Sequence, residues 1–76
     1  MENICIKFGK NIKKYRNKMG ISQEELALRC ELHRTYISSV ERGVRSISLK
    51  NIEILAKELE VNICELFKFE EKIKND

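Results

Sequence analysis

The chain has 76 residues, so we expect a single domain over 1–76, because two domains of half this length would each lack a core. It has no proline and three glycines, and this helix-favouring composition predicts an all-α fold. No apolar run approaches the roughly 20 residues that cross a membrane, and no signal-peptide segment opens the chain, so we expect a cytoplasmic protein.

Charge is unevenly distributed along the chain. The formal net charge is +3, but residues 1–50 carry a net +6 and residues 51–76 a net −3. This asymmetry favours a basic face that meets a polyanion and an acidic part that faces away from it. Scattered solubilising charge explains the same distribution equally well.

The first expected helix spans about residues 5–19. Its apolar residues recur every three or four positions and form one stripe: Cys5, Phe8, Ile12, Tyr15 and Met19. Lysines occupy much of the remaining surface, and Gly20 supplies the left-handed residue that ends the helix.

A pair of short helices follows. Ser22 and Glu25 form a capping-box pattern that opens a helix over 23–30, and a third helix begins near Arg34 and ends at Gly43. Two short helices joined by a turn of three or four residues match the helix-turn-helix plan, in which the second helix enters the major groove of DNA.

Two further helices complete the expected five-helix bundle. Ser48 caps a fourth helix, and Asn62 opens a short fifth one. The core of the domain then covers about residues 5–67, and residues 68–76 form a polar tail that frays.

The outward side of the third helix is unusual for a surface helix. Ile37 and Val40 point inward, whereas the other side carries two arginines, a threonine and two serines. Small serines let a helix approach the floor of a groove about 12 Å wide, and arginine matches the two acceptors of guanine with two parallel donors. For this stretch alone, an exposed polar helix without a ligand is an equally good interpretation.

Three stretches, ISQEELALRC, HRTYISSVERG and LKNIEILAKELEV, fix several residue types at defined offsets, namely Gln23, Leu26, Ala27, Ile37, Ser38, Glu41 and Gly43. With these residues the sequence resembles, over about 8–67, the Xre-type (lambda-repressor-like) helix-turn-helix family. The resemblance implies a five-helix DNA-binding domain and an ion pair between Arg16 and Glu41, with DNA contacts of these two residues as the alternative. Glu31 departs from the family, which usually has glycine there, and a positive φ would cost glutamate about 1 kcal/mol.

A narrower resemblance rests on RTYISSVERGVRSISLKNIEIL, which looks like the controller proteins of restriction–modification systems. These are small homodimers that regulate their own gene and the endonuclease gene. The resemblance implies that Arg34 reads guanine, assisted by Thr35 and Ser38, and that Arg45 reaches a base edge or the backbone.

Five residues are expected to contact phosphate. The resemblance implies this role for Tyr36 and Ser39, and Arg42 shares the outward side of the third helix. Gln23 and Ser22 stand at a helix N-terminus, where donors suit a phosphate, although capping alone explains Ser22 equally well.

No cofactor, metal or catalytic site is expected. The three cysteines lie far apart and form no CxxC pair, and with only one histidine, His33, beside them this pattern argues against zinc ligation. We expect reduced, mostly buried thiols, and His33 as a cap or flank of the third helix. Without a Gly-rich phosphate loop or a Ser/His/Asp or Cys/His arrangement, an enzyme is not expected.

One domain of this size contacts few base pairs, so we expect a homodimer on an inverted-repeat operator in double-stranded DNA. Apolar residues of the fourth and fifth helices should divide between the core and the dimer seam: Ile52, Leu55, Ile63, Leu66 and Phe67.

Other partners and functions stay open. Glu24 matches an acidic position through which some family repressors touch RNA polymerase, although favourable placement at a helix N-terminus is the simpler explanation. The alternatives to a controller protein are another Xre-type repressor, or an antitoxin or adaptor that binds mainly a protein. An adaptor would need an exposed apolar tail, for which the candidates are Phe67, Phe69 and Ile73.

Overall fold

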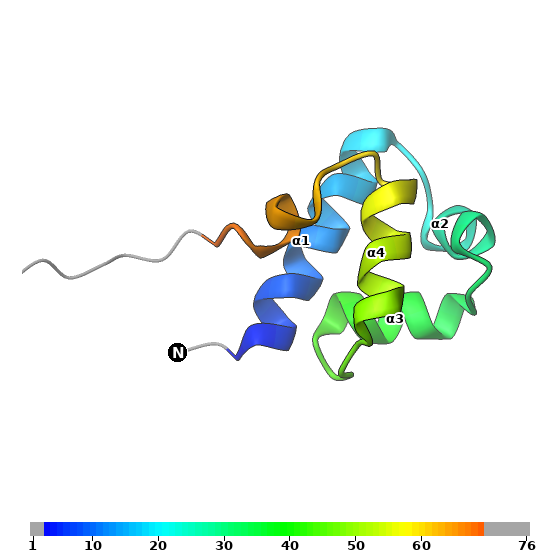
Figure 1. Ribbon diagram of the computed structural model, residues 1–76. Coiled ribbons are helices and arrows are strands. Elements are labelled where there is room, and N and C mark those ends of the chain that lie inside the picture. The colour runs from blue at the N-terminus through cyan, green and yellow to red at the C-terminus, as the bar shows by residue number, and fades with distance from the viewer. Residues whose placement is uncertain (1–2, 70–76) are drawn as a thin grey trace, which may run out of the picture.

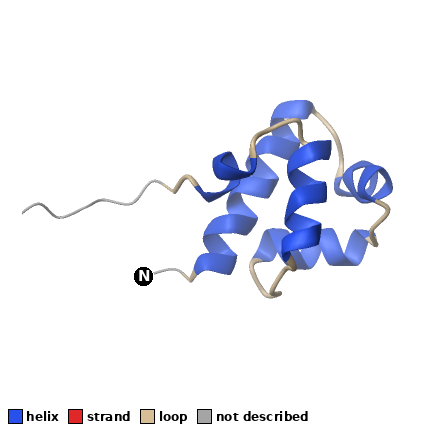
Figure 2. Cartoon of the chain, in the orientation of Figure 1, coloured by secondary structure: helices blue, strands red, loops and turns tan. Residues whose placement is uncertain are grey.

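The computed structural model describes residues 3–69 as a bundle of four α-helices and one short 3-10 helix (Figure 1). The elements are α1 (Ile4–Met19), α2 (Gln23–Cys30), α3 (Arg34–Arg42), α4 (Leu49–Glu58) and η1 (Ile63–Phe67). Figure 2 shows only helices and loops over this part of the chain. The all-helical fold and the first four helices agree with the sequence-based expectation, and residues 70–76, with Ile73 and most of the expected tail, lie outside the described range.

The helix ends follow local side-chain chemistry. Ser22 Oγ accepts a hydrogen bond from the Glu25 N–H at 3.0 Å, and Ser48 Oγ accepts one from the Asn51 N–H at 3.1 Å. Gly20 ends α1 with a left-handed φ of 70°, as predicted.

The turn between α2 and α3 contains a residue under backbone strain. Glu31 adopts φ 57° and ψ 41°, in the left-handed region that disfavours a side chain. The Leu32 N–H still donates to the Ala27 carbonyl at 2.9 Å, so the turn has the hydrogen bonding that a glycine would give. The departure from the family pattern therefore changes the energy of the turn and leaves its geometry intact.

Helices α1 and α3 approach each other closely at Gly9. A Cβ atom at Gly9 would lie 2.2 Å from the Val40 carbonyl oxygen and 2.7 Å from that of Glu41. Only a residue without a side chain fits there, so Gly9 sets the distance between the first helix and the end of α3.

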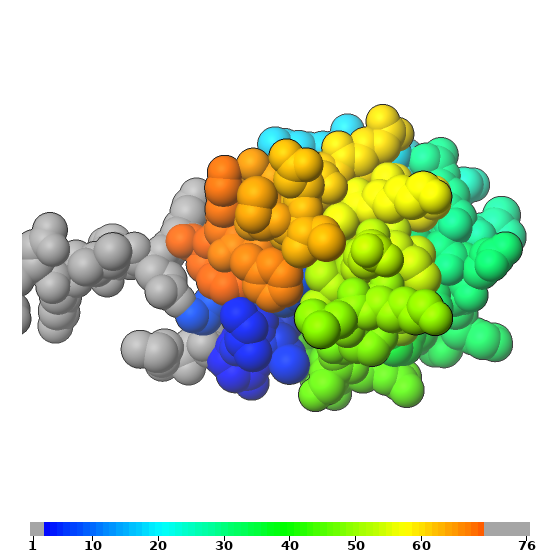
Figure 3. Space-filling view, in the orientation of Figure 1, coloured from blue at the N-terminus to red at the C-terminus, as the bar shows by residue number. Residues whose placement is uncertain are grey.

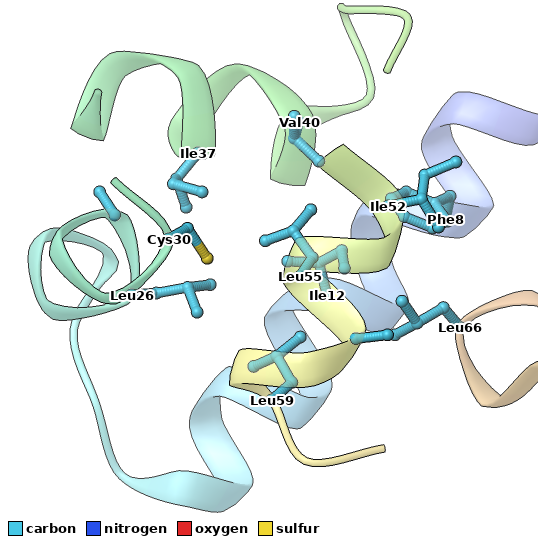
Figure 4. Close-up of a cluster of buried hydrophobic side chains, with 12 residues drawn as sticks. Phe8, Ile12, Leu26, Cys30, Ile37, Val40, Ile52, Leu55, Leu59 and Leu66 are labelled. Carbon is cyan, nitrogen blue, oxygen red and sulfur yellow. The ribbon is translucent and has the colours of Figure 1, made fainter. Parts of the chain in front are cut away.

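The core gathers side chains from all five elements, as Figure 4 shows. The largest fully buried side chains are Ile12, Leu26, Ile37, Val40, Leu55 and Leu66. Three residues expected at a dimer seam belong to this core: Leu55 and Leu66 are 0% exposed and Ile52 is 7% exposed. Of the five residues expected to divide between the core and the dimer seam, these three therefore fall to the core, because the same chain already covers them.

The C-terminal segment packs on α1 and α4 instead of forming a fifth α-helix. Residues 63–67 form a 3-10 helix, and extended backbone at Lys68 ends it. Asn11 Nδ2 donates to the carbonyls of Leu66 at 2.9 Å and Lys68 at 3.0 Å. In Figure 3 this orange segment lies against the blue start of α1 and beside α4.

The cysteines differ in exposure. Cys30 is buried, Cys5 is half-buried and Cys64 is exposed, so the expectation of mostly buried thiols is wrong for Cys64. Across residues 3–69, no helix has both the length and the apolar character needed to cross a membrane.

Candidate nucleic-acid interface

Helix α3 presents the predicted contact residues on one side. Ile37 and Val40 are buried, and this anchors α3 against the core. Arg34, Thr35 and Arg42 are exposed, whereas the two serines of the same helix are half-buried. The small side chains thus lie on the helix surface between longer basic residues, as a helix inserted into the major groove requires.

The two serines are not equivalent. Ser39 Oγ donates its hydrogen to the Thr35 carbonyl at 2.9 Å, within α3 itself. A phosphate oxygen is only an acceptor, so Ser39 can donate to phosphate only after its hydroxyl rotates away from Thr35. Ser38 is half-exposed on the same helix and remains a predicted base contact.

One residue predicted to contact phosphate and one predicted to contact a base edge lie together at α3 and the loop after it. The Arg45 guanidinium lies 4.8 Å from the centroid of the Tyr36 ring, within cation–π distance. Asn51 Nδ2, from the first turn of α4, donates to Tyr36 Oη at 3.0 Å. Tyr36, expected at phosphate, and Arg45, expected at a base edge, therefore form one unit in the free protein.

A buried ion pair anchors the end of α3. Arg16 Nε and Nη2 donate to Glu41 Oε2 and Oε1 at 2.6 and 3.1 Å, and both residues are buried. Arg16 Nη1 also donates to the Ile21 carbonyl at 2.8 Å. The ion pair that the family resemblance implies is therefore confirmed, and burial of both side chains leaves the alternative, contact with DNA, without support.

Gln23 takes part in this network. Its Nε2 donates to Glu41 Oε1 at 3.0 Å, so the side-chain amide faces the protein interior. Glu41 accepts one of the two Nε2 hydrogens, so the phosphate contact of Gln23 stays a prediction for the second Nε2 hydrogen and for the backbone N–H at the start of α2. Ser22 is exposed, and its oxygen caps α2.

His33 and Cys30 differ in exposure, since His33 is exposed and Cys30 is buried. His33 occupies the N-cap position of α3 but makes no capping bond through its side chain. Burial, reinforced by the nearby Glu58 carboxylate, raises the pKa of the Cys30 thiol to about 11. Cys30 therefore stays protonated and unreactive at neutral pH. Residues 3–69 contain no group of three or more His, Cys, Asp and Glu side chains able to hold a metal ion.

Comparisons with known proteins agree with this geometry. The helix-turn-helix family matches residues 12–66. Control protein C.BamHI from Bacillus amyloliquefaciens is 48% identical over 68 residues, covering 88% of this chain and 84% of that protein. The crystal structure of the restriction–modification controller protein C.AhdI from Aeromonas hydrophila is 44% identical, with a TM-score of 0.81 over 83% of this chain and 96% of that one. The chain belongs to the helix-turn-helix family of restriction–modification controller proteins.

Another controller protein, C.Esp1396I, has been solved as a tetramer in complex with its natural 35 base-pair operator. It is 37% identical, with a TM-score of 0.74 over 90% of this chain and 100% of that chain. The predicted class, a helix-turn-helix transcription regulator of the controller type, is thus confirmed. Which residues of this chain contact bases or phosphates stays a prediction.

Two of the five residues considered for the dimer seam are exposed on the folded chain. Ile63 and Phe67 are 45% and 39% exposed, and the Phe67 ring packs tilted against Phe8 with ring centroids 5.1 Å apart. Beside them, Lys68 donates to Glu65 at 2.9 Å. This hydrogen bond lowers the pKa of the Glu65 carboxyl and raises the pKa of Lys68. An apolar patch edged by an ion pair therefore lies on η1, away from α3.

Asn51 was absent from the sequence-based set of contact residues. It follows the Ser48 cap by three positions, and in the sequence this spacing indicates only an ordinary helix start. Only the folded chain brings it to Tyr36, 15 positions earlier.

Proposed function

We propose that this chain is a sequence-specific DNA-binding regulator that acts on the operator of a restriction–modification system. The observation that carries the proposal is α3, a helix anchored by a buried Arg16–Glu41 pair whose outward side combines exposed arginines with small polar residues. The solved operator complex of C.Esp1396I supports operator DNA as the ligand.

Each side chain has a distinct role in this proposal. Arg34 reads guanine from the start of α3, with Thr35 and Ser38 beside it and Arg45 at the neighbouring base edge or backbone. The phosphate contacts come from backbone and side-chain donors on α2 and α3: Ser22, the Gln23 N–H, Tyr36, Ser39 and Arg42.

The proposed binding unit is a homodimer on an inverted-repeat operator. One α3 helix reads only a few base pairs, and two such helices must meet successive major grooves about 34 Å apart. Ile63 and Phe67 provide the exposed apolar residues for the seam, on a segment that packs on α1 and α4 and leaves the outward side of α3 open. The part that pairs therefore lies apart from the part that binds DNA.

The same proposal covers location and chemistry. A regulator of this kind works where the DNA lies, in the cytoplasm, and it acts by occupying an operator without catalysing a reaction. Contact with RNA polymerase through Glu24 is an additional element, supported by the exposure of this side chain on the first turn of α2.

Selection from a random duplex library provides the decisive experiment. The purified protein should enrich an inverted repeat, and its affinity for that site should exceed its affinity for random DNA by about 10³-fold or more. Enrichment of no sequence, or of a single unrepeated site, would contradict the proposal. Binding to random DNA alone, with a steep salt dependence, would indicate a nonspecific DNA-binding protein.

A further inference from the structure

The Tyr36 hydroxyl has one hydrogen to donate, and its environment determines where that hydrogen points. A phenol oxygen carries one hydrogen and accepts through its lone pairs. Asn51 Nδ2 donates to this oxygen at 3.0 Å and occupies one of those lone pairs. The hydrogen of Tyr36 is therefore free to point away from Asn51, toward an acceptor outside the protein.

Asn51 is itself held firmly. Ser48 Oγ accepts the Asn51 backbone N–H at 3.1 Å, which fixes the first turn of α4. Asn51 and Tyr36 are both half-buried, and the hydrogen bond between them is partly shielded from solvent. The Arg45 guanidinium stacks on the same ring with 4.8 Å between Cζ and the centroid, so the position of the ring also affects Arg45.

We propose that Asn51 is a positioning residue for DNA recognition, which holds the Tyr36 ring and directs its hydroxyl hydrogen outward to a phosphate oxygen. The inference rests on the proposed function, because it needs Tyr36 to contact DNA. Asn51 does not touch the DNA in this role; it acts through Tyr36 and, through the shared ring, on Arg45.

The sharpest variant is Asn51→Asp, which keeps the size of the side chain and reverses the polarity of the hydrogen bond. A carboxylate can only accept, so Tyr36 would donate its hydrogen inward and lose it for phosphate. Residue 51 lies in the first turn of α4, where a carboxylate is favourable toward the helix dipole. The variant should therefore fold as well as the parent protein, and thermal unfolding checks this.

The effect of the added negative charge on DNA affinity must be separated from the effect of the changed hydrogen bond. Asn51→Asp is therefore compared in the parent and in a Tyr36→Phe background, which lacks the hydroxyl. The affinity for the selected operator should fall about tenfold more in the parent than in the Tyr36→Phe protein, the size expected for one hydrogen bond to a charged group. Leu49→Asp, at a side chain 85% exposed on the same turn, serves as the matched charge control.

The outcomes separate the inference from the function on which it rests. An equal loss of affinity in both Tyr36 backgrounds, or a loss no larger than that of Leu49→Asp, overturns the role of Asn51 while operator binding stands. A protein that selects no operator at all overturns the proposed function itself.

Discussion

Nε of Arg16 lies 2.6 Å from Oε2 of Glu41, and this ion pair joins the last turn of α1 to the end of α3. The Arg16 and Glu41 side chains are only 11% and 3% exposed, so water contributes little to solvating either charge. The orientation of the recognition helix α3 therefore depends on two charges that must be present together.

Arg16→Met should lower the free energy of unfolding by about 3–5 kcal/mol, because it leaves the buried Glu41 charge without a positive partner. Urea denaturation at neutral pH measures the loss. The double variant Arg16→Met/Glu41→Leu should recover part of it. Arg29→Met is the control, since the Glu25–Arg29 pair is 43% and 37% exposed and should change stability by less than about 1 kcal/mol. Equal effects of Arg16→Met and Arg29→Met would contradict the structural role of the buried pair.

Gly9→Ala should unfold the protein or lower its melting temperature sharply, because the new Cβ would lie 2.2 Å from the Val40 carbonyl oxygen. Gly20→Ala is the matched control. Nothing lies within 4 Å of a Cβ there, and only the positive φ of 70° opposes it. That strain costs about 1 kcal/mol. Circular dichroism melts of both variants test the comparison, and similar melting temperatures would refute the close approach at Gly9.

Arg34→Ala should weaken binding to the selected operator by about 1–3 kcal/mol and binding to random DNA far less, because a base contact carries sequence information. Fluorescence anisotropy on both duplexes gives the two values. Lys57→Ala removes the same charge from an exposed position on α4 and should affect both duplexes only slightly. Equal losses for Arg34→Ala on both DNAs would show that Arg34 contacts phosphate instead.

Ile63→Glu and Phe67→Glu should split the proposed dimer, because each places a charge in an apolar seam. Sedimentation at micromolar concentration, with and without the operator, measures the state of assembly. Leu28→Glu puts the same charge on an apolar side chain of α2 that is 73% exposed, and it should leave the dimer intact. Parent protein that sediments as a monomer with and without operator would exclude the dimer.

Glu24→Lys should reduce activated transcription while operator occupancy stays complete, provided that Glu24 contacts RNA polymerase. In vitro transcription combined with footprinting separates the two quantities. Unchanged activation at full occupancy would reduce Glu24 to a favourable charge at the start of α2, with a contribution of about 0.3–1 kcal/mol to the stability of that helix.

The sequence predicts α1 to α4 well because their signals are local. Ser22, Gly20 and Ser48 fix helix ends through neighbouring residues, and the apolar stripes repeat with the helical period. The strained Glu31 could also be anticipated from a local mismatch with the family. The type of η1 could not, because five residues are too few to distinguish 3-10 from α spacing.

Burial and side-chain pairing depended on tertiary structure and were predicted less well. Leu55 and Leu66 have the same apolar character as Phe67, and only the packing of η1 on α1 and α4 decides which of them is covered. The inward turn of Gln23 to Glu41 and the bond from Asn51 to Tyr36 join residues 18 and 15 positions apart. Neither pairing produces a repeating spacing of residues by which it could be predicted from the sequence.

The amide of Asn11 has a consequence for the spacing of the two operator halves. It bonds the carbonyls of Leu66 and Lys68 to α1, and the same α1 is held against α3 at Gly9. In a dimer paired through Phe67, two copies of α1 would therefore set the separation of the two α3 helices. Such a dimer should tolerate little insertion or deletion between its half-sites, since one added base pair shifts a half-site by 3.4 Å and turns it about the DNA axis.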